Sequence, residues 1–368
     1  MNGSEILHRA RGDLQAAIAR QGKPPNTPPM AASAWVAMSA MQKAIRRGRV
    51  TLALAAAATL LRDAPEKLWR RAACLAYEDV GLASLGTIGL ATAALAGKRA
   101  RAELGGEWAV ASALVSELAR APKCRGADDL LMSCELHPAY GEARAKLPRL
   151  ATRDLIALAT GSGAIHDRAL ALWYAVGTFR RSSRLVVRHG DARIAFDLLR
   201  QAGWPETVVE IAREGFRRTG EALCPLVALL ACESEEPGTR VSDELPAEQM
   251  IGDVPGWALD AYTREGRAAF ARFLRSEAAS ARWARRHVPA ERRAAVLGHV
   301  VFRVEGGLVA NRIRRPLTDE LRRQVDFECA GLERRAAMEF IDLARADVAA
   351  LNAARAELRS EGRGGDES

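Results

Sequence analysis

Met38-Ser-Ala-Met-Gln-Lys-Ala-Ile-Arg-Arg-Gly48 has the spacing of an amphipathic α-helix. The apolar residues that recur at i, i+3 and i+7 and line one face are Met38, Met41 and Ile45. The cations that share another face are Lys43, Arg46 and Arg47. Gly48 stands where a C-cap glycine belongs, and the helix dipole favours cations in the last turn. We expect one side of this helix to pack and the other to be free to meet anions.

Leu68-Trp-Arg-Arg-Ala-Ala-Cys-Leu-Ala-Tyr-Glu-Asp-Val-Gly-Leu82 predicts a second helix, with Asp63 as its N-cap and Pro65 in its first turn. Its inward stripe is Trp69, Ala73, Ala76 and Val80. Glu78 and Asp79 stand in the last turn, where the dipole repels carboxylates by roughly 0.3–1 kcal/mol each. These acids need cations from elsewhere, and the Lys43, Arg46 and Arg47 face is the nearest candidate. A salt bridge between helices is favoured over a ligand-facing role.

Together with Ala119-Arg-Ala-Pro-Lys-Cys-Arg125, these strings resemble the C-terminal helical region of the replication-associated recombination protein A family, the bacterial relatives of the Werner-interacting AAA+ ATPases. That region has a SALQKAIRRGD helix, a RRL…ASEDVGLA helix and an APKS turn in this order. The segment Val254-Pro-Gly-Trp-Ala-Leu-Asp-Ala-Tyr-Thr-Arg-Glu-Gly-Arg267 resembles the IPDYALDKHTxxGR tail of short stand-alone members. Ala261 and Tyr262 replace a Lys and a His of that tail, so a role of that His does not carry over.

The resemblance implies an all-α, clamp-loader-collar-like core linked to DNA replication and repair, which mediates oligomerisation in the full-length ATPases. We expect no ATP hydrolysis, because the ATPase domains are missing. The family-like residues that would form a partner surface are Gln42, Lys43, Arg46, Arg47, Arg70, Arg71, Glu78, Asp79, Lys123, Arg125, Asp260, Tyr262, Thr263, Arg264 and Arg267.

The composition favours helices over sheets. Only 5% of the 368 residues are aromatic, and Ala, Leu and Arg dominate, as in long helices. The 54 Lys and Arg exceed the 45 Asp and Glu, which gives a net charge of +9. This basic bias fits a nucleic acid or an acidic protein partner, and it fits an Arg-rich genome-wide composition equally well.

We expect an all-α protein of one or more multi-helix bundles with short connections. Helices are predicted at 3–21, 34–47, 50–62, 65–80, 84–97 and 105–121. The segments are an N-terminal helix and Pro-rich linker (1–33), the family-like core (34–126), an additional helical region (127–232), an acidic loop (233–256), an Arg-rich helical region with a long C-terminal helix (257–360) and a disordered tail (361–368).

Several local features are also predicted. The residues predicted to lie in the core of the additional region are Trp173, Tyr174, Phe179, Ile194, Phe196, Leu198 and Leu199. A basic ridge at helical spacing is Arg180, Arg181, Arg184 and Arg188, most simply a solvated face. Thr318 is the expected N-cap of the long C-terminal helix. His299-Val-Val-Phe-Arg-Val304 is the only β-like run.

Residues 264–293 hold nine arginines and three glutamates, with Phe270, Phe273 and Trp283 among them. Guanidinium groups neutralise phosphates and rings stack on bases, so this pattern suits a groove for single-stranded nucleic acid. The candidate residues are Arg272, Arg275, Arg282, Trp283, Arg285 and Arg286. The same spacing fits ordinary helices whose apolar residues pack in the core and whose arginines face solvent, and this interpretation is favoured. A third reading has the acidic loop fold over the segment as a pseudo-ligand.

No catalytic or cofactor motif is found. The six cysteines show no metal-ligand spacing and read as buried free thiols, and the scattered histidines form no metal or nucleophile motif. We therefore expect no cofactor, no metal and no membrane span, and a cytoplasmic location, with the nucleoid as an alternative.

Three functions follow. The preferred one is a non-enzymatic DNA replication and repair protein whose helical core self-associates or docks on a replication ATPase or a single-strand-binding protein. Its arginine-rich faces would bind DNA, with single strands favoured. The second is a structural component of a phage or mobile element that does not bind DNA. The third is an unrecognised enzyme with a site near Glu78, Asp79, Asp260 and Arg267.

Overall fold

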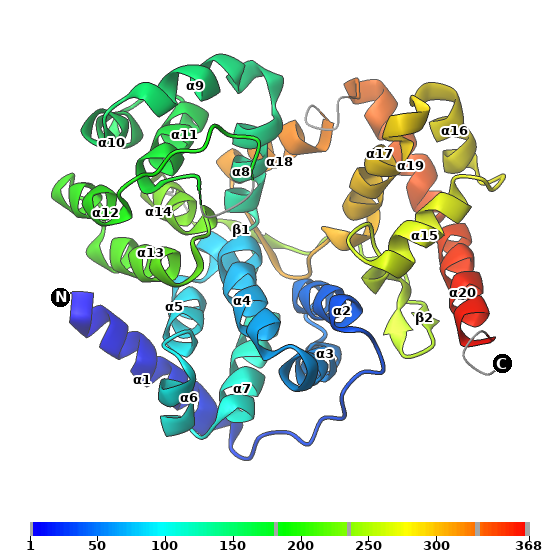
Figure 1. The fold of residues 1–368 in the computed structure, drawn as a ribbon, viewed down its shortest axis with the longest axis horizontal. Coiled ribbons are helices and arrows are strands. Elements are labelled where there is room, and N and C mark those ends of the chain that lie inside the picture. The colour runs from blue at the N-terminus through cyan, green and yellow to red at the C-terminus, as the bar shows by residue number, and fades with distance from the viewer. Residues whose placement is uncertain (1–2, 180–182, 234–236, 328–331, 365–368) are drawn as a thin grey trace. The chain divides into compact units, whose positions relative to one another are not determined.

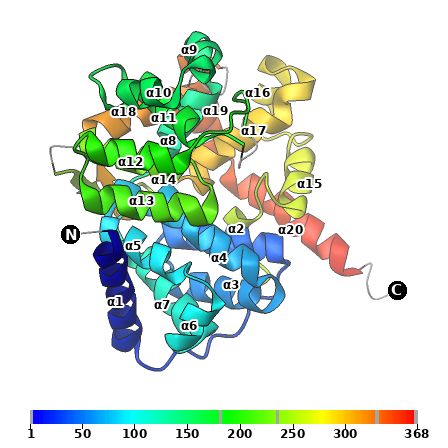
Figure 2. The ribbon, with the colours of Figure 1, turned by 60° about the vertical axis from the view of Figure 1, so that its left-hand side comes forward.

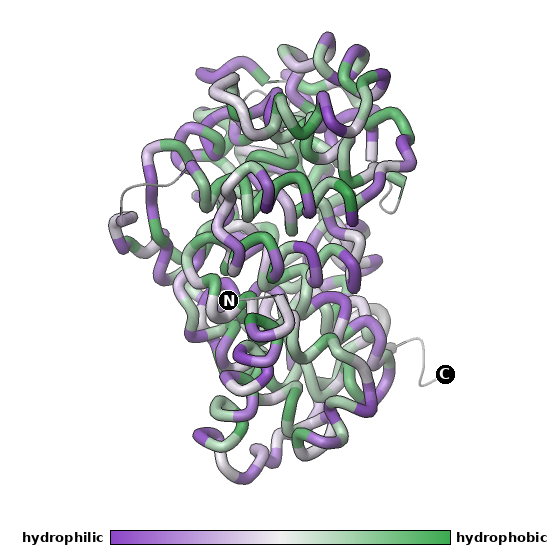
Figure 3. Tube along the Cα trace, turned by 90° about the vertical axis from the view of Figure 1, so that its left-hand side faces the viewer, coloured by the Kyte–Doolittle hydropathy of each residue, from purple (hydrophilic) through white to green (hydrophobic). Residues whose placement is uncertain are grey.

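A computed structural model confirms the predicted all-α class. It describes residues 3–179, 183–233, 237–327 and 332–364, and 72% of the chain is helical (Figure 1). Strands are few and short in the described ranges. Hydrophobic and hydrophilic residues alternate in short runs along the helices (Figure 3), as amphipathic packing requires. No helix in the described ranges is both long and apolar enough to cross a bilayer.

The chain divides into two compact units, each built from three separate segments. Unit 1 comprises Met1–Pro24, Trp69–Val241 and Asn311–Val325, and unit 2 comprises Pro25–Leu68, Ser242–Ala310 and Asp326–Ser368. The boundary between Leu68 and Trp69 lies inside helix α4 (Pro65–Leu75). The family-like stretch 34–126 is thus shared between the units.

Unit 1 contains most of the helices of the first two-thirds of the chain and part of one later helix. They are α1 (Gly3–Gln21), α5 (Leu85–Ala94), α6 (Lys98–Glu103), α7 (Glu107–Arg120), α8 (Gly126–Leu136), α9 (Gly141–Lys146), α10 (Thr152–Thr160), α11 (Ile165–Val176), α12 (Ala192–Gln201), α13 (Glu206–Thr219), α14 (Leu223–Glu233) and most of α18 (Pro316–Phe327). Short π and 3-10 turns are η1 (Ala76–Val80), η2 (Gly81–Ala83), η3 (Pro138–Tyr140) and η4 (Leu147–Arg149). Helices α12 and α13 lie side by side (Figure 2), and α13 packs on α14.

Unit 2 contains α2 (Ala34–Arg46), α3 (Val50–Asp63), α15 (Arg264–Phe273), α16 (Ala279–His287), α17 (Arg293–Val301), α19 (Arg334–Ala346) and α20 (Val348–Gly364), with the short turns η5 (Gly256–Ala258), η6 (Ala290–Arg292) and η7 (Phe302–Gly306). Helix α15 packs on α20, and α16 and α17 pack on α19. Their shared core includes the stacked rings of Trp283 and Phe340, whose centroids are 4.6 Å apart.

Two short antiparallel pairings complete the described structure. β1 (Thr239–Val241) pairs with β4 (Arg312–Arg314), with Arg240 opposite Ile313. β2 (Met250–Ile251) pairs with β3 (Val254–Pro255). The segment predicted as an exposed acidic loop therefore contributes strands to both units. Its Glu235 and Glu236 lie outside the described residues.

Several helix ends differ from the prediction. Asp63 is the last residue of α3, where it pairs with Arg62, and is not the N-cap of α4. Thr318 lies inside the first turn of α18, because that helix already begins at Pro316. Its hydroxyl accepts a hydrogen bond from the Arg315 amide at 3.2 Å. Helix α6 was not predicted.

The end of the chain also differs. The single long C-terminal helix is in fact α18, α19 and α20, and α20 extends to Gly364, into the tail predicted to be disordered. The β-like run 299–304 is helical, split between α17 and the π-helix η7. Residues 365–368 lie outside the described part, so the prediction there stays open.

The core prediction for the additional region holds for some residues only. Trp173, Tyr174 and Phe196 are buried, whereas Phe179 and Ile194 are 43% and 42% exposed. The basic ridge is not a helix, because Arg184 and Arg188 lie in the connection between α11 and α12. Arg180 and Arg181 lie outside the described residues.

Candidate functional site

The cations of the Met38–Gly48 helix are buried, which corrects the prediction of a free cationic face. Lys43, Arg46 and Arg47 are 2%, 2% and 6% exposed. Tertiary partners account for this burial, and all of them lie more than 200 positions later in the chain. We call this group, with Asp260, Glu305 and Arg355, the Lys43 cluster.

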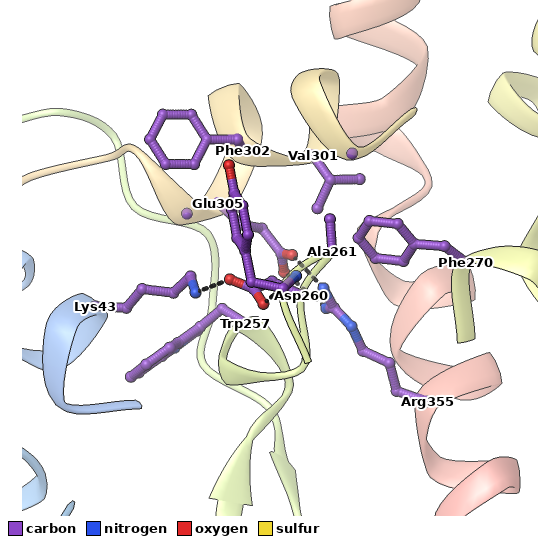
Figure 4. A pocket seen from close by; sticks show the side chains of 12 residues that line it. Lys43, Trp257, Asp260, Ala261, Phe270, Val301, Phe302, Glu305 and Arg355 are labelled. Carbon is purple, nitrogen blue, oxygen red and sulfur yellow. Dashed lines mark hydrogen bonds and ion pairs between the residues drawn. The ribbon is translucent and has the colours of Figure 1, made fainter. Parts of the chain in front are cut away.

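Lys43 reaches Asp260, which follows the 3-10 turn η5. Its ammonium donates to Asp260 Oδ2 (Figure 4) and, at 2.5 Å, to Ser39 Oγ. Asp260 Oδ1 in turn accepts from the Tyr262 amide at 2.9 Å. Burial lowers the pKa of Lys43, although Asp260 opposes that shift. Burial alone would raise the pKa of Asp260, but the Lys43 ammonium, the Tyr262 amide and the Ser39 hydroxyl together outweigh it, and the net direction is down.

Arg46 and Arg47 cap the carboxyl end of η7. Arg46 Nη1 donates to the Gly306 carbonyl at 2.6 Å, and Arg47 Nη2 donates to the Glu305 carbonyl at 2.7 Å. The last carbonyls of a helix lack partners within it and carry its negative partial charge, so guanidinium groups are favourable there. The Arg47 guanidinium also lies 4.7 Å from the Trp257 ring centroid. Burial lowers the pKa of Arg47 to about 10.

Arg355 on α20 closes the Lys43 cluster. It holds both carboxylate oxygens of Glu305, at 3.2 and 2.9 Å, and donates to the Leu259 carbonyl at 3.0 Å. Sequence analysis missed both Glu305 and Arg355. A usable signal existed for Arg355 only, because it follows Leu351 by four positions and so falls on the buried stripe of its helix.

The Lys43 cluster lines a very small cavity. Lys43, Trp257, Asp260, Glu305 and Arg355 contribute to its wall, and its volume is about 10 Å³. Such a volume holds roughly one water molecule. The charges contact one another here, and these contacts join α2, η5, η7 and α20 within unit 2.

A second buried group, the Asp79 cluster, lies in unit 1. Arg125 Nη1 donates to Asp79 Oδ1 and, at 3.3 Å, to Glu78 Oε1, and Arg125 Nη2 donates to Asp128 Oδ2. The side chains of Asp79 and Arg125 are 0% and 3% exposed. Burial disfavours the charge on Arg125, but the carboxylates around it outweigh burial and raise its pKa. The salt-bridge reading of Glu78 and Asp79 thus holds, with Arg125 in place of the predicted partners.

Gly81 lets the 122–125 turn approach the end of η1. Its φ is +49°, and a Cβ there would lie 2.4 Å from the Cys124 carbonyl oxygen. The Cys124 amide donates to the Asp79 carbonyl at 2.9 Å, which fixes Arg125 beside the acids. Lys123 is 1% exposed and donates to the carbonyls of Leu118 and Ala119 at the end of α7. Burial lowers its pKa to about 8.

The rest of the predicted partner surface is mixed. Thr263 is buried as the N-cap of α15, and its hydroxyl accepts from the Gly266 amide at 3.0 Å. Gln42 and Arg71 are half-buried. The exposed members are Arg70, Tyr262, Arg264 and Arg267. Glu78 and Asp79 belong to unit 1 and Asp260 and Arg267 to unit 2, so the four residues of the enzyme hypothesis fall in separate units.

The predicted aromatic platform for bases is absent from α15 and α16. Phe270, Phe273 and Trp283 are buried in the core of unit 2, so their faces are covered by protein. Arg285 donates to the carbonyls of Leu274 and Ser276 at 2.7 and 2.6 Å. Arg272 is half-buried and pairs with Glu357 at 3.2 Å.

Six other arginines of residues 264–293 are exposed, and we call all of them except Arg292 the exposed arginine set. They are Arg264, Arg267, Arg275, Arg282 and Arg286. Arg264 and Arg267 are three positions apart on α15, so they project from one face. Arg282 lies 3.9 Å from Glu277, a loose contact. For the other four guanidinium groups the described residues supply no hydrogen-bond or ion-pair partner.

Cysteines and metal ligands add no further site in the described part of the chain. Cys74, Cys124, Cys134 and Cys224 are buried free thiols and Cys232 is half-buried, while Cys329 lies outside that part. No group of His, Cys, Asp and Glu within the described ranges could hold a metal ion. Comparison of the chain with protein-family models, curated proteins and solved structures found no match.

Proposed function

We propose that this protein is a non-enzymatic binding protein that holds the phosphate backbone of a nucleic acid through the exposed arginine set. The observation that carries the proposal is a set of four solvent-exposed guanidinium groups that pair with no acid of the described residues. Two of them lie on α15, one in the turn that follows it and one on α16. Arginine donates to phosphate oxygens in a bidentate geometry, and each phosphate it neutralises releases counterions. The excess of cations over the whole chain, +9, acts in the same direction.

The buried aromatics change the expected selectivity. The sequence favoured single strands because rings would stack on bases, and the rings concerned face the core. Contacts to phosphates alone position a protein without reading bases. The proposal is therefore backbone binding to single-stranded and duplex DNA alike, with little dependence on base sequence.

A role in DNA replication or repair, with a replication ATPase or a single-strand-binding protein as partner, is proposed from the family-like strings. Their charged residues pair in two sets, Lys43 with Asp260 and Asp79 with Arg125. The first pair joins two of the family-like strings within unit 2, and the second joins the other two within unit 1, which supports the idea that the strings are kept as packed pairs. Self-association is proposed on the same basis, and a monomer by light scattering at high protein concentration would contradict it.

The DNA proposal is tested by fluorescence anisotropy with single-stranded and duplex oligonucleotides over a series of salt concentrations. The test variant replaces three exposed arginines, R264Q/R267Q/R275Q. Each lost phosphate contact should lower the slope of log K against log salt by ~0.7 to ~0.9, so the slope should fall by about 2. Affinity at low salt should fall at least ~10-fold.

The matched control removes the same net charge at exposed arginines that already have acidic partners. It is R62Q/R217Q/R345Q, whose partners are Asp63, Glu214 and Asp342. We expect this variant to bind like the unaltered protein. Equal weakening by both variants would show that only net charge matters, and no binding of the unaltered protein at low salt would remove the proposal.

A further inference from the structure

Tyr262 is an exposed aromatic residue that stands two positions before helix α15. Its exposed fraction is 76%, the highest among the large apolar side chains that the structure describes. Burial of an aromatic ring is favourable, but a single exposed one is ordinary, so the exposure alone assigns no role. The rigidity of its backbone and the charge of the helix that follows it are two further observations.

The backbone around Tyr262 is fixed although its side chain is open to solvent. The Tyr262 amide donates to Asp260 Oδ1 at 2.9 Å, and the buried Lys43 ammonium holds the same carboxylate. The Thr263 amide and hydroxyl donate to the Asp260 carbonyl at 3.1 and 3.0 Å. Gly266 makes room for this turn, since a Cβ there would overlap the Asp260 carbonyl oxygen. The ring is therefore presented from an ordered turn, which lowers the entropic cost of binding through it.

Two members of the exposed arginine set follow Tyr262 within five positions. Arg264 and Arg267 lie at the start of α15, roughly 60° apart around the helix axis. Glu265 is also exposed, but it lies about 100° to the other side of Arg264 and so about 160° from Arg267. The side of α15 that carries both arginines is therefore cationic.

The other acids of this region are already paired. The acids whose side chains the structure describes on α15 and on its packing partners α17 and α20 are Glu265 and Glu357. Glu357 pairs with Arg272 at 3.2 Å, and Asp260 of the preceding turn pairs with Lys43. A polyanion can therefore approach the two arginines beside the exposed ring.

We propose that Tyr262 stacks on an unpaired base of a nucleic acid whose phosphates lie on Arg264 and Arg267. This inference rests on the proposed function and deepens it, because phosphate contacts alone do not distinguish a single strand from a duplex. A base inside a duplex has both faces covered by its neighbours, whereas a base of a single strand can turn out and offer a face to the ring. Stacking does not read base identity, since every base has a π-face. Tyr262 therefore adds a preference for single strands without a preference for sequence.

Fluorescence anisotropy on the full chain tests this inference with two probes, a single strand of thymidines and a blunt duplex of the same length. Tyr262→Ala should weaken binding to the single strand at least about 5-fold and leave binding to the duplex within about 2-fold. Tyr262→Phe keeps the ring and should bind both probes like the unaltered protein. The matched control is Trp35→Ala, which removes a ring that is 55% exposed on α2 and should change neither affinity.

Photocrosslinking gives a direct readout of stacking. A single strand that carries iododeoxyuridine attaches on illumination to an aromatic ring stacked on that base, and mass spectrometry should find the attachment at Tyr262. The inference is overturned if attachment occurs only elsewhere, or if Tyr262→Ala weakens binding to both probes equally or to neither.

The proposed function fails in a different way. R264Q/R267Q/R275Q should weaken binding to both probes, because the phosphates of either one lose their contacts. If the unaltered protein binds neither probe at low salt, the proposed function falls and the role of Tyr262 falls with it.

Discussion

Arg125 contacts three carboxylates at once, and Asp79 among them is fully buried. Taking a charge out of water is costly, and the cost is offset only while the opposite charge stays in contact. The main effect of such a pair is therefore to constrain the backbone, because it fixes the turn at 122–125 against the end of η1. The Lys43 cluster acts in the same way in unit 2, where Arg355 holds Glu305.

Replacing Arg125 by Met should destabilise the protein by about 3–5 kcal/mol, because the Asp79 carboxylate loses its guanidinium while it stays buried. Adding Asp79→Asn to that variant should recover part of the loss. Urea unfolding of the two single variants and the double variant gives the coupling energy. Arg345→Met, which breaks an exposed pair with Asp342, is the control and should cost no more than about 1 kcal/mol. Similar losses for the two arginines would contradict the role of Arg125.

The sequence pattern singled out the charged residues Lys43 and Asp79, but it did not predict which residues bury them. Asp79 stood out as a charge that needs a cation, and Lys43 was expected on a face free to meet anions. Helical spacing placed Lys43 on a polar face, yet the partner that buries it lies 217 positions away. Periodicity reports only the contacts of one helix with an unspecified core, so it carries no information about which distant acid covers which cation.

At the scale of elements, the helix predictions were most accurate where apolar residues recur regularly. The 3–21 and 50–62 helices were predicted to within one residue of α1 and α3. The run 299–304 was mistaken for a strand because it is rich in Val, yet it is helical and buries Val300, Val301 and Val304 in the core of unit 2. Tertiary packing outweighed the local preference. The π-helical turn η1 was indicated in the sequence only weakly, by Glu78 and Asp79 in the last turn of the predicted helix.

Gly81 offers a test of that turn. Gly81→Ala should destabilise the protein by at least about 2 kcal/mol more than Gly22→Ala. Both glycines have positive φ, at +49° and +69°, so both substitutions strain the backbone by about 1–3 kcal/mol. Only at Gly81 would the new Cβ meet a carbonyl oxygen, at 2.4 Å, whereas nothing lies within 4 Å at Gly22. Urea unfolding of both variants measures the difference, and equal losses would show that the 122–125 turn can move away.

At the scale of the whole molecule, each unit depends on segments that are far apart in the chain. Unit 1 needs residues 311–325, which supply β4 and the buried Leu321 and Val325 of α18. The Lys123 amide donates to the Asn311 carbonyl at 2.9 Å, and the Ile313 amide donates to the Lys123 carbonyl at 2.8 Å. Composition predicted helices and cores of this size, but only three-dimensional packing shows which segments share a core.

Truncation tests this dependence. A chain that ends at residue 325 retains every segment of unit 1, whereas a chain that ends at residue 310 loses β4 and α18. We expect hydrogen exchange at the β1 amides and in α8 to stay slow in the longer chain and to become fast in the shorter one. Equal protection in both would mean that unit 1 is complete without residues 311–325.

The interleaved segments also have a consequence for biosynthesis. A ribosome delivers the chain from its first residue onward, and β4 and α18 are among the last parts of unit 1 to leave it. Until then the apolar side of α8 lacks the Thr318 side chain that covers Gly126. Nascent chains of this protein therefore expose incompletely covered hydrophobic surface for most of translation. Such surface aggregates unless it is shielded, so we expect chaperones that bind growing chains to act on this protein.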